Sequence, residues 1–120
     1  MLKDSLYNIT SLEESTDNRY TLTVKLDVHH EIFKGHFPAQ PVLPGVCLIE
    51  MVKEFLMEIK KRPYRLSIAQ NIKYLRLVDP NEEPVLKFEL DLQEGEALKV
   101  DVTSFLKDGT ANFKLKGSFV

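Results

Sequence analysis

The side chains of this sequence that are best suited to chemistry gather in residues 29–52. All three histidines lie there, and His36 stands between a glycine and the apolar pair Phe37-Pro38. Because imidazole changes its charge near neutral pH, a loop histidine of this kind can act as a general base. The simpler interpretation is a loop histidine that packs on Phe37, and the residue alone does not decide between the two.

Glu50 is the only charged residue between Pro41 and Val52, where every other residue is apolar or glycine. Burying an ionised carboxylate without a partner is costly, so such surroundings would favour the protonated form. A protonated Glu50 could donate a proton in acid–base catalysis. Helical periodicity permits a second interpretation, in which Glu50 begins a solvated stripe together with Glu54 and Lys61.

Pro44-Gly45 predicts the start of a helix, because proline fits the first turn, where its missing N–H costs nothing. The unpaired N–H groups at such a start carry partial positive charge, which suits a developing oxyanion. Pro-Gly is also common helix punctuation without any chemical role. Together, His36, Glu50 and the Gly45 amide have the composition of a site for acid–base chemistry beside a carbonyl group.

His30, Glu31 and His36 are only superficially like a zinc motif. In H-E-x-x-H the two histidines share one helix face, whereas here the second histidine follows six residues later, beyond Gly35. The single cysteine, Cys47, excludes an intrachain disulfide and a cysteine-cluster metal site. We therefore predict no metal site.

Two strands, a helix and four further strands are expected to position these residues. Alternation is clearest in the second strand, where Tyr20, Leu22 and Val24 share one face. Asp108-Gly109 is a strong hairpin turn between the last two strands. We expect strands at about 6–13, 19–28, 65–77, 84–92, 97–107 and 111–119, and a helix from 44 to about 61. Short connections favour an antiparallel sheet, so we predict an α+β fold in which a curved sheet wraps one central helix whose first half is buried all round.

The composition indicates one domain over residues 1–120 and excludes several classes of protein. Apolar residues make up 43% of the 120 residues and the net charge is −2, which is unlike a disordered tail or a nucleic-acid-binding protein. The first residues lack the apolar core of a signal peptide, and the run Pro41–Val52 is too short to span a bilayer. We expect a cytoplasmic protein.

Residues 33–50 carry a family signature. The run FKGHFPAQPVLPGVCLIE resembles that of the β-hydroxyacyl-acyl-carrier-protein dehydratases, which is F-x-G-H-F-P-x-x-P-hydrophobic-x-P-G-V followed by an apolar trio and Glu. The resemblance implies a hot-dog fold and a homodimer with active sites at the subunit interface. It places the catalytic histidine on His36, the catalytic glutamate on Glu50, and the glycine whose N–H polarises the thioester carbonyl on Gly45.

The same resemblance implies removal of water from a β-hydroxyacyl thioester carried on the phosphopantetheine of an acyl carrier protein. The product would be the trans-2-enoyl thioester, formed without a metal or redox cofactor. The candidates that line the acyl tunnel are Phe33, Phe37, Pro38, Val42 and Val46. An acidic carrier would favour a basic rim, for which Lys34, Lys60, Lys61 and Arg62 are available.

The chain departs from the family pattern directly after Glu50. The usual Ala-x-Ala-Gln is replaced there by Met51-Val52-Lys53-Glu54, so the pocket lining and the preferred acyl chain length stay open. Two alternatives from other classes stay open. One is a hot-dog acyl thioesterase, and the other is a non-catalytic acyl-carrier-binding partner of a heteromeric dehydratase.

Overall fold

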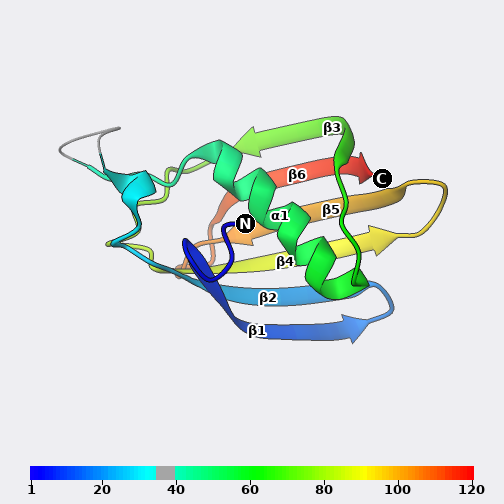
Figure 1. The fold of residues 1–120 in the computed structure, drawn as a ribbon, viewed down its shortest axis with the longest axis horizontal. Helices are drawn as coiled ribbons and strands as arrows, with labels where there is room; N and C mark the ends of the chain where they lie inside the picture. The colour runs from blue at the N-terminus through cyan, green and yellow to red at the C-terminus, as the bar shows by residue number, and fades with distance from the viewer. Residues whose placement is uncertain (35–39) are drawn as a thin grey trace.

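Six antiparallel strands form one sheet, and one long helix lies across it in a computed structural model that describes residues 1–34 and 40–120 (Figure 1). The strand order is β1-β2-β4-β5-β6-β3, so β1 and β3 are the two edges. The elements are β1 (Tyr7–Thr16), β2 (Arg19–Leu26), the short 3-10 helix η1 (Glu31–Phe33), α1 (Gly45–Lys60), β3 (Leu66–Tyr74), β4 (Val85–Gln93), β5 (Leu98–Phe105) and β6 (Ala111–Phe119). The predicted succession of strands and helix is confirmed.

Some strand boundaries differ from the prediction. At the end of β3, backbone N–H groups form hydrogen bonds that do not belong to the regular pairing of the strands. β3 ends at Tyr74 rather than near 77, because the N–H groups of Leu75 and Arg76 both donate to the carbonyl of Asn112. β1 continues to Thr16, and the turn to β2 uses Asn18 at φ 61°, a left-handed conformation that asparagine tolerates. The predicted hairpin turn at Gly109 is present, with φ 87°.

α1 begins after Pro44, which occupies the N-cap, and ends where Lys61 adopts a left-handed conformation and donates its N–H to the carbonyl of Met57. Its buried face includes Leu48, Met51 and Phe55. The prediction that the first half is buried all round is wrong, because Val46 is 72% exposed. One sheet covers one side of the helix only.

Within residues 1–34 and 40–120, no helix has the length and apolarity that crossing a bilayer requires.

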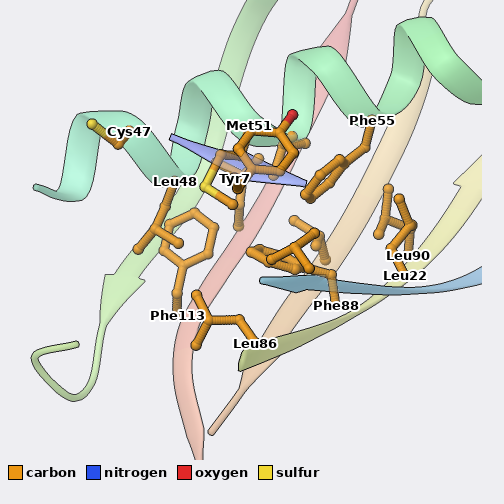
Figure 2. Packing of buried hydrophobic residues seen from close by; sticks show 14 of the residues in the cluster. Tyr7, Leu22, Cys47, Leu48, Met51, Phe55, Leu86, Phe88, Leu90 and Phe113 are labelled. Carbon is orange, nitrogen blue, oxygen red and sulfur yellow. The ribbon is translucent and has the colours of Figure 1, made fainter. Parts of the chain in front are cut away.

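Aromatic rings fix α1 on the middle of the sheet (Figure 2). The ring of Phe55 meets Tyr7 edge-on at a centroid distance of 5.7 Å and Phe88 at 4.8 Å. All three side chains are fully buried. Leu22 and Leu90 lie on the sheet strands beneath the helix (Figure 2). The position of α1 over the sheet therefore depends on the packing around Phe55.

Phe55→Ala should lower the free energy of unfolding by about 3–5 kcal/mol, because it removes a buried ring and both of its aromatic contacts. Urea denaturation monitored by circular dichroism measures this loss. Leu12→Ala is the control, since Leu12 is 42% exposed on the edge strand β1, and it should cost below about 1 kcal/mol. Equal losses from the two substitutions would contradict the assignment of Phe55 to the centre of the core.

Candidate active site

Glu50 lies on the side of α1 that the sheet leaves uncovered. We call the residues of this side, Val46, Ile49, Glu50, Lys53 and Met57, the open stripe. The Glu50 side chain is 40% exposed, and its Oε2 lies 3.3 Å from Nζ of Lys53. The predicted apolar surroundings of Glu50 are therefore not present in the single chain, where a lysine one turn away pairs with it.

Within residues 1–34 and 40–120, no side-chain hydrogen bond caps the amino-terminal end of α1. Pro44 at the N-cap makes no side-chain hydrogen bond, and the first turn holds no acidic residue. The N–H of Cys47 donates to the carbonyl of Pro44 at 3.0 Å, which leaves the amides of Gly45 and Val46 as those that the helix does not use. Unpaired backbone N–H groups at a helix start are hydrogen-bond donors of the kind that an oxyanion site uses.

The ring of Tyr74 covers Gly45. This contact was not predicted from the sequence. A Cβ atom at Gly45 would lie 2.6 Å from Cζ of Tyr74, so the ring packs directly on the glycine. The ring also stacks on Phe113 at 5.5 Å, and partial burial raises the pKa of the Tyr74 hydroxyl. Glycine at position 45 thus permits a close approach of β3 to the start of α1. No sequence signal links residues so far apart.

The other predicted site residues fall into three groups. Phe33 in η1 is buried in the core, and Val42 is half-buried in the segment before α1. Val46 is on the open stripe. His36, Phe37 and Pro38 lie outside the described residues.

His30 takes part in local structure. Its Nδ1 accepts a hydrogen bond from the N–H of Ile32 at 3.0 Å, which caps η1. A capping role accounts for a histidine at this position.

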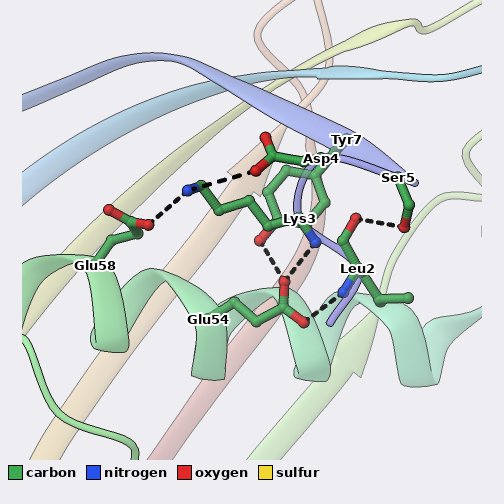
Figure 3. Close-up of polar contacts among 7 residues, drawn as sticks. All are labelled: Leu2, Lys3, Asp4, Ser5, Tyr7, Glu54 and Glu58. Carbon is green, nitrogen blue, oxygen red and sulfur yellow. Dashed lines mark hydrogen bonds and ion pairs between the residues drawn. The ribbon is translucent and has the colours of Figure 1, made fainter.

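Glu54 is buried, although the second interpretation placed it on a solvated stripe with Glu50 and Lys61. Its residue exposure is 3%, and its carboxylate accepts three hydrogen bonds (Figure 3). Oε2 accepts from the N–H of Leu2 at 2.8 Å, and Oε1 accepts from the N–H of Lys3 at 2.8 Å and the hydroxyl of Tyr7 at 2.9 Å. Burial and this bond to the carboxylate raise the pKa of Tyr7. The sequence signal for this burial is the apolar type of the residues around Glu54 on the helix. These residues, Met51, Val52, Phe55 and Leu56, are buried as well.

A hollow of about 170 Å³ lies beside Glu50, and we call it the Glu50 hollow. Glu50, Lys53 and Met57 of the open stripe form one side of it. Glu54, Met1, Pro63 and Tyr64 are the other lining residues. The hollow thus combines three charged side chains, those of Glu50, Lys53 and Glu54, with apolar and aromatic walls.

The predicted basic rim is partly engaged within the chain. Nζ of Lys60 lies 2.5 Å from Oε1 of Glu94 and bonds to the side-chain oxygen of Asn18 at 3.4 Å. The guanidinium of Arg62 lies over the ring of Tyr64 at 4.1 Å. These contacts within the chain account for Lys60.

Comparison with known proteins adds a family and a fold. The family model described as ApeI-like, ApeI dehydratase, matches residues 12–114. The 3-hydroxyacyl-[acyl-carrier-protein] dehydratase FabZ of Lactococcus lactis is 25% identical over 105 residues, which cover 82% of this chain and 70% of that protein. The chain spans 57–70% of the length of the curated relatives of this name that it matches.

The solved structures confirm the predicted hot-dog architecture. The dehydratase heterocomplex ApeI:P from Xenorhabdus doucetiae superposes with a TM-score of 0.75 at 21% identity, over 93% of this chain and 96% of that chain. A hypothetical thioesterase with coenzyme A from Streptococcus pneumoniae gives a TM-score of 0.63 at 15% identity, over 94% and 83% of the two chains. The fold is therefore shared by dehydratases and thioesterases.

Gly45→Ala should displace the ring of Tyr74 from Phe113, because the new methyl group has no room beside the ring. We expect a loss of about 1 kcal/mol, since the flexible end of a half-exposed tyrosine can move aside. In a double-mutant cycle, Gly45→Ala should cost less in a Tyr74→Ala background, where its Cβ has space. Thermal unfolding of the four proteins measures the coupling, and additive effects would contradict the contact.

Proposed function

Because this chain belongs to the ApeI-like dehydratase family, one with the hot-dog fold, we propose that it is a hydro-lyase. Its substrate would be a β-hydroxyacyl thioester on an acyl carrier protein, and its product the trans-2-enoyl thioester, in cytoplasmic fatty-acid or related acyl-chain synthesis. The chain's match to the family model over residues 12–114 is the observation that carries this proposal.

In the proposed reaction His36 takes the proton from the α-carbon as general base. The electron pair of the broken C–H bond forms the double bond, and the C–O bond at the β-carbon breaks. Glu50 supplies the proton with which the hydroxyl leaves as water. The Gly45 N–H, at the positive end of α1, holds the enolate-like thioester oxygen.

The placement of Gly45 and Glu50 supports these roles. Glu50 is accessible to a substrate on the open stripe, and the helix end at Gly45 has no side-chain cap among the described residues. The Glu50–Lys53 pair is exposed, so releasing it costs little. The role of His36 as general base is inferred from the resemblance of its motif to the family signature.

We further propose a homodimer in which His36 of one subunit faces Glu50 of the other. The first seven residues of the edge strand β3, Leu66–Ile72, carry no charge, and Lys73 follows them. An uncharged stretch of an edge strand is a template for pairing with another chain. Apolar side chains are exposed along it and beyond its end: Ile68 is 58%, Leu75 48% and Leu77 75% exposed. Val46 of the open stripe adds a further exposed apolar residue. A second subunit would cover these side chains and complete the site.

An acyl thioesterase is the second candidate, because thioesterases share this fold. The two activities leave different products, since hydrolysis releases a free thiol from an acyl thioester and dehydration does not. A non-catalytic partner of a heteromeric dehydratase is the third, and turnover by the purified chain alone would eliminate it.

His36→Ala and Glu50→Gln should each lower the rate of hydration of crotonyl thioester by about 10²-fold or more, because each removes one of the two proton-transfer groups. Ultraviolet absorbance of the conjugated thioester follows the reaction. Glu50→Gln should leave the melting temperature nearly unchanged, since it removes only an exposed ion pair.

Two matched variants serve as controls. His29→Ala changes an exposed histidine before η1, and Glu58→Gln changes a glutamate two turns along α1 from Glu50. Both should retain wild-type rates. If His36→Ala kept more than about a tenth of the wild-type rate, the assignment of His36 as the base would be wrong.

A further inference from the structure

The first six residues, which we call the N-terminal strap (residues 1–6), are bound to α1 by polar contacts (Figure 3). Glu54 accepts the N–H groups of Leu2 and Lys3, and Nζ of Lys3 lies 2.7 Å from Oε1 of Glu58. The contact between the two side chains raises the pKa of Lys3 and lowers that of Glu58. The strap is therefore attached to two successive turns of the helix.

The strap also has a defined internal structure. The N–H of Leu6 donates to the carbonyl of Leu2 at 2.7 Å, and the N–H of Asp4 donates to the carbonyl of Tyr7 at 2.7 Å, with Asp4 at φ 68°. Leu6 is fully buried, and it anchors the strap in the core directly before β1. The strap is fixed at Leu2, Lys3 and Leu6, which sets the place of the adjoining Met1, a residue that is itself 73% exposed.

That place is the Glu50 hollow, of which Met1 forms a wall. Met57, Pro63 and Tyr64 form its other apolar sides, and Glu50, Lys53 and Glu54 line it with charged groups. At about 170 Å³ the hollow is smaller than the roughly 300–1,000 Å³ of pockets that hold whole small molecules. It fits part of a ligand, and the apolar part next to the carbon on which Glu50 acts is the acyl tail.

We propose that the N-terminal strap is a wall of the acyl-tail pocket and that Glu54 is the positioning residue that holds it there. The inference rests on the proposed function, because it takes Glu50 as the group that acts at the β-carbon. All three hydrogen bonds that the Glu54 carboxylate accepts come from the strap and Tyr7. Glu54 acts through the main chain of Leu2 and Lys3, and so through Met1.

A carboxylate is required because the donors approach both of its oxygens. Oε2 serves Leu2 alone, while Oε1 serves Lys3 and Tyr7. Glutamine offers one oxygen and one NH₂ group, so Glu54→Gln keeps the acceptor for Lys3 and Tyr7 but sets a donor against the N–H of Leu2. The substitution should release the first two residues and leave the rest of the strap in place.

The test compares Glu54→Gln with Glu58→Gln, which breaks only the ion pair of Lys3. For 2-enoyl thioesters with tails longer than crotonyl, Glu54→Gln should raise KM about tenfold and leave kcat within about twofold, the pattern for loss of binding that ground and transition states share. The effect should be small for crotonyl thioester, whose tail is too short to reach the wall. Glu58→Gln should leave both constants within about twofold of wild type.

Hydrogen exchange at the amides of Leu2 and Lys3 should show that Glu54→Gln exposes Leu2. A fall in thermal stability with unchanged KM at every tail length would overturn the proposal, because a merely structural anchor would behave in that way. Should Glu54→Gln fail to fold, Leu2→Pro removes the same hydrogen bond from the other side and should raise KM equally.

Equilibrium binding of octanoyl-coenzyme A separates this inference from the proposed function. Weaker binding to Glu54→Gln than to wild type and Glu58→Gln supports the acyl-tail wall even if the wild-type chain shows no hydration activity. That lack of activity would contradict the proposed function alone. Equal binding to all three proteins, or none to the wild type, would overturn the inference.

Discussion

The whole arrangement depends on one constraint: a single-layered sheet covers only one side of a helix. Leu48, Met51 and Phe55 occupy the covered side and hold α1 on the sheet. The other side must face solvent or a second surface. Because residues 1–34 and 40–120 form no second layer over this side, the open stripe is left accessible.

Two glutamates one helical turn apart show the effect of this constraint, because one is exposed and the other is buried. Glu50 points to the open stripe and pairs with Lys53, an exposed contact that contributes little to stability. Glu54 lies between the helix and the strap, where three donors satisfy its carboxylate. Hydrogen bonds to a charged group contribute about 1.5–3 kcal/mol each, so Glu54 holds the strap on α1, whereas Glu50 stays accessible.

The fold could be predicted from the sequence because its signals are local. Alternation marks β2 through Leu22 and Val24, and Gly109 marks the last hairpin. The errors come from contacts between distant segments. Periodicity could not show that the strap covers Glu54, that Val46 has no cover, or that Tyr74 rests on Gly45. The roles of His36, Gly45 and Glu50 stay predictions, since they rest on a motif and His36 lies outside the described residues.

Complementation tests most directly whether the site is shared between two subunits. Inactive His36→Ala and Glu50→Gln chains are refolded together and assayed with crotonyl thioester. Random pairing makes about half of the dimers mixed, and each mixed dimer has one site with an intact histidine and an intact glutamate. The account predicts recovery of about a quarter of the wild-type activity. If both residues acted within one chain, every site would carry a lesion, and a mixture that stays inactive would contradict the shared site.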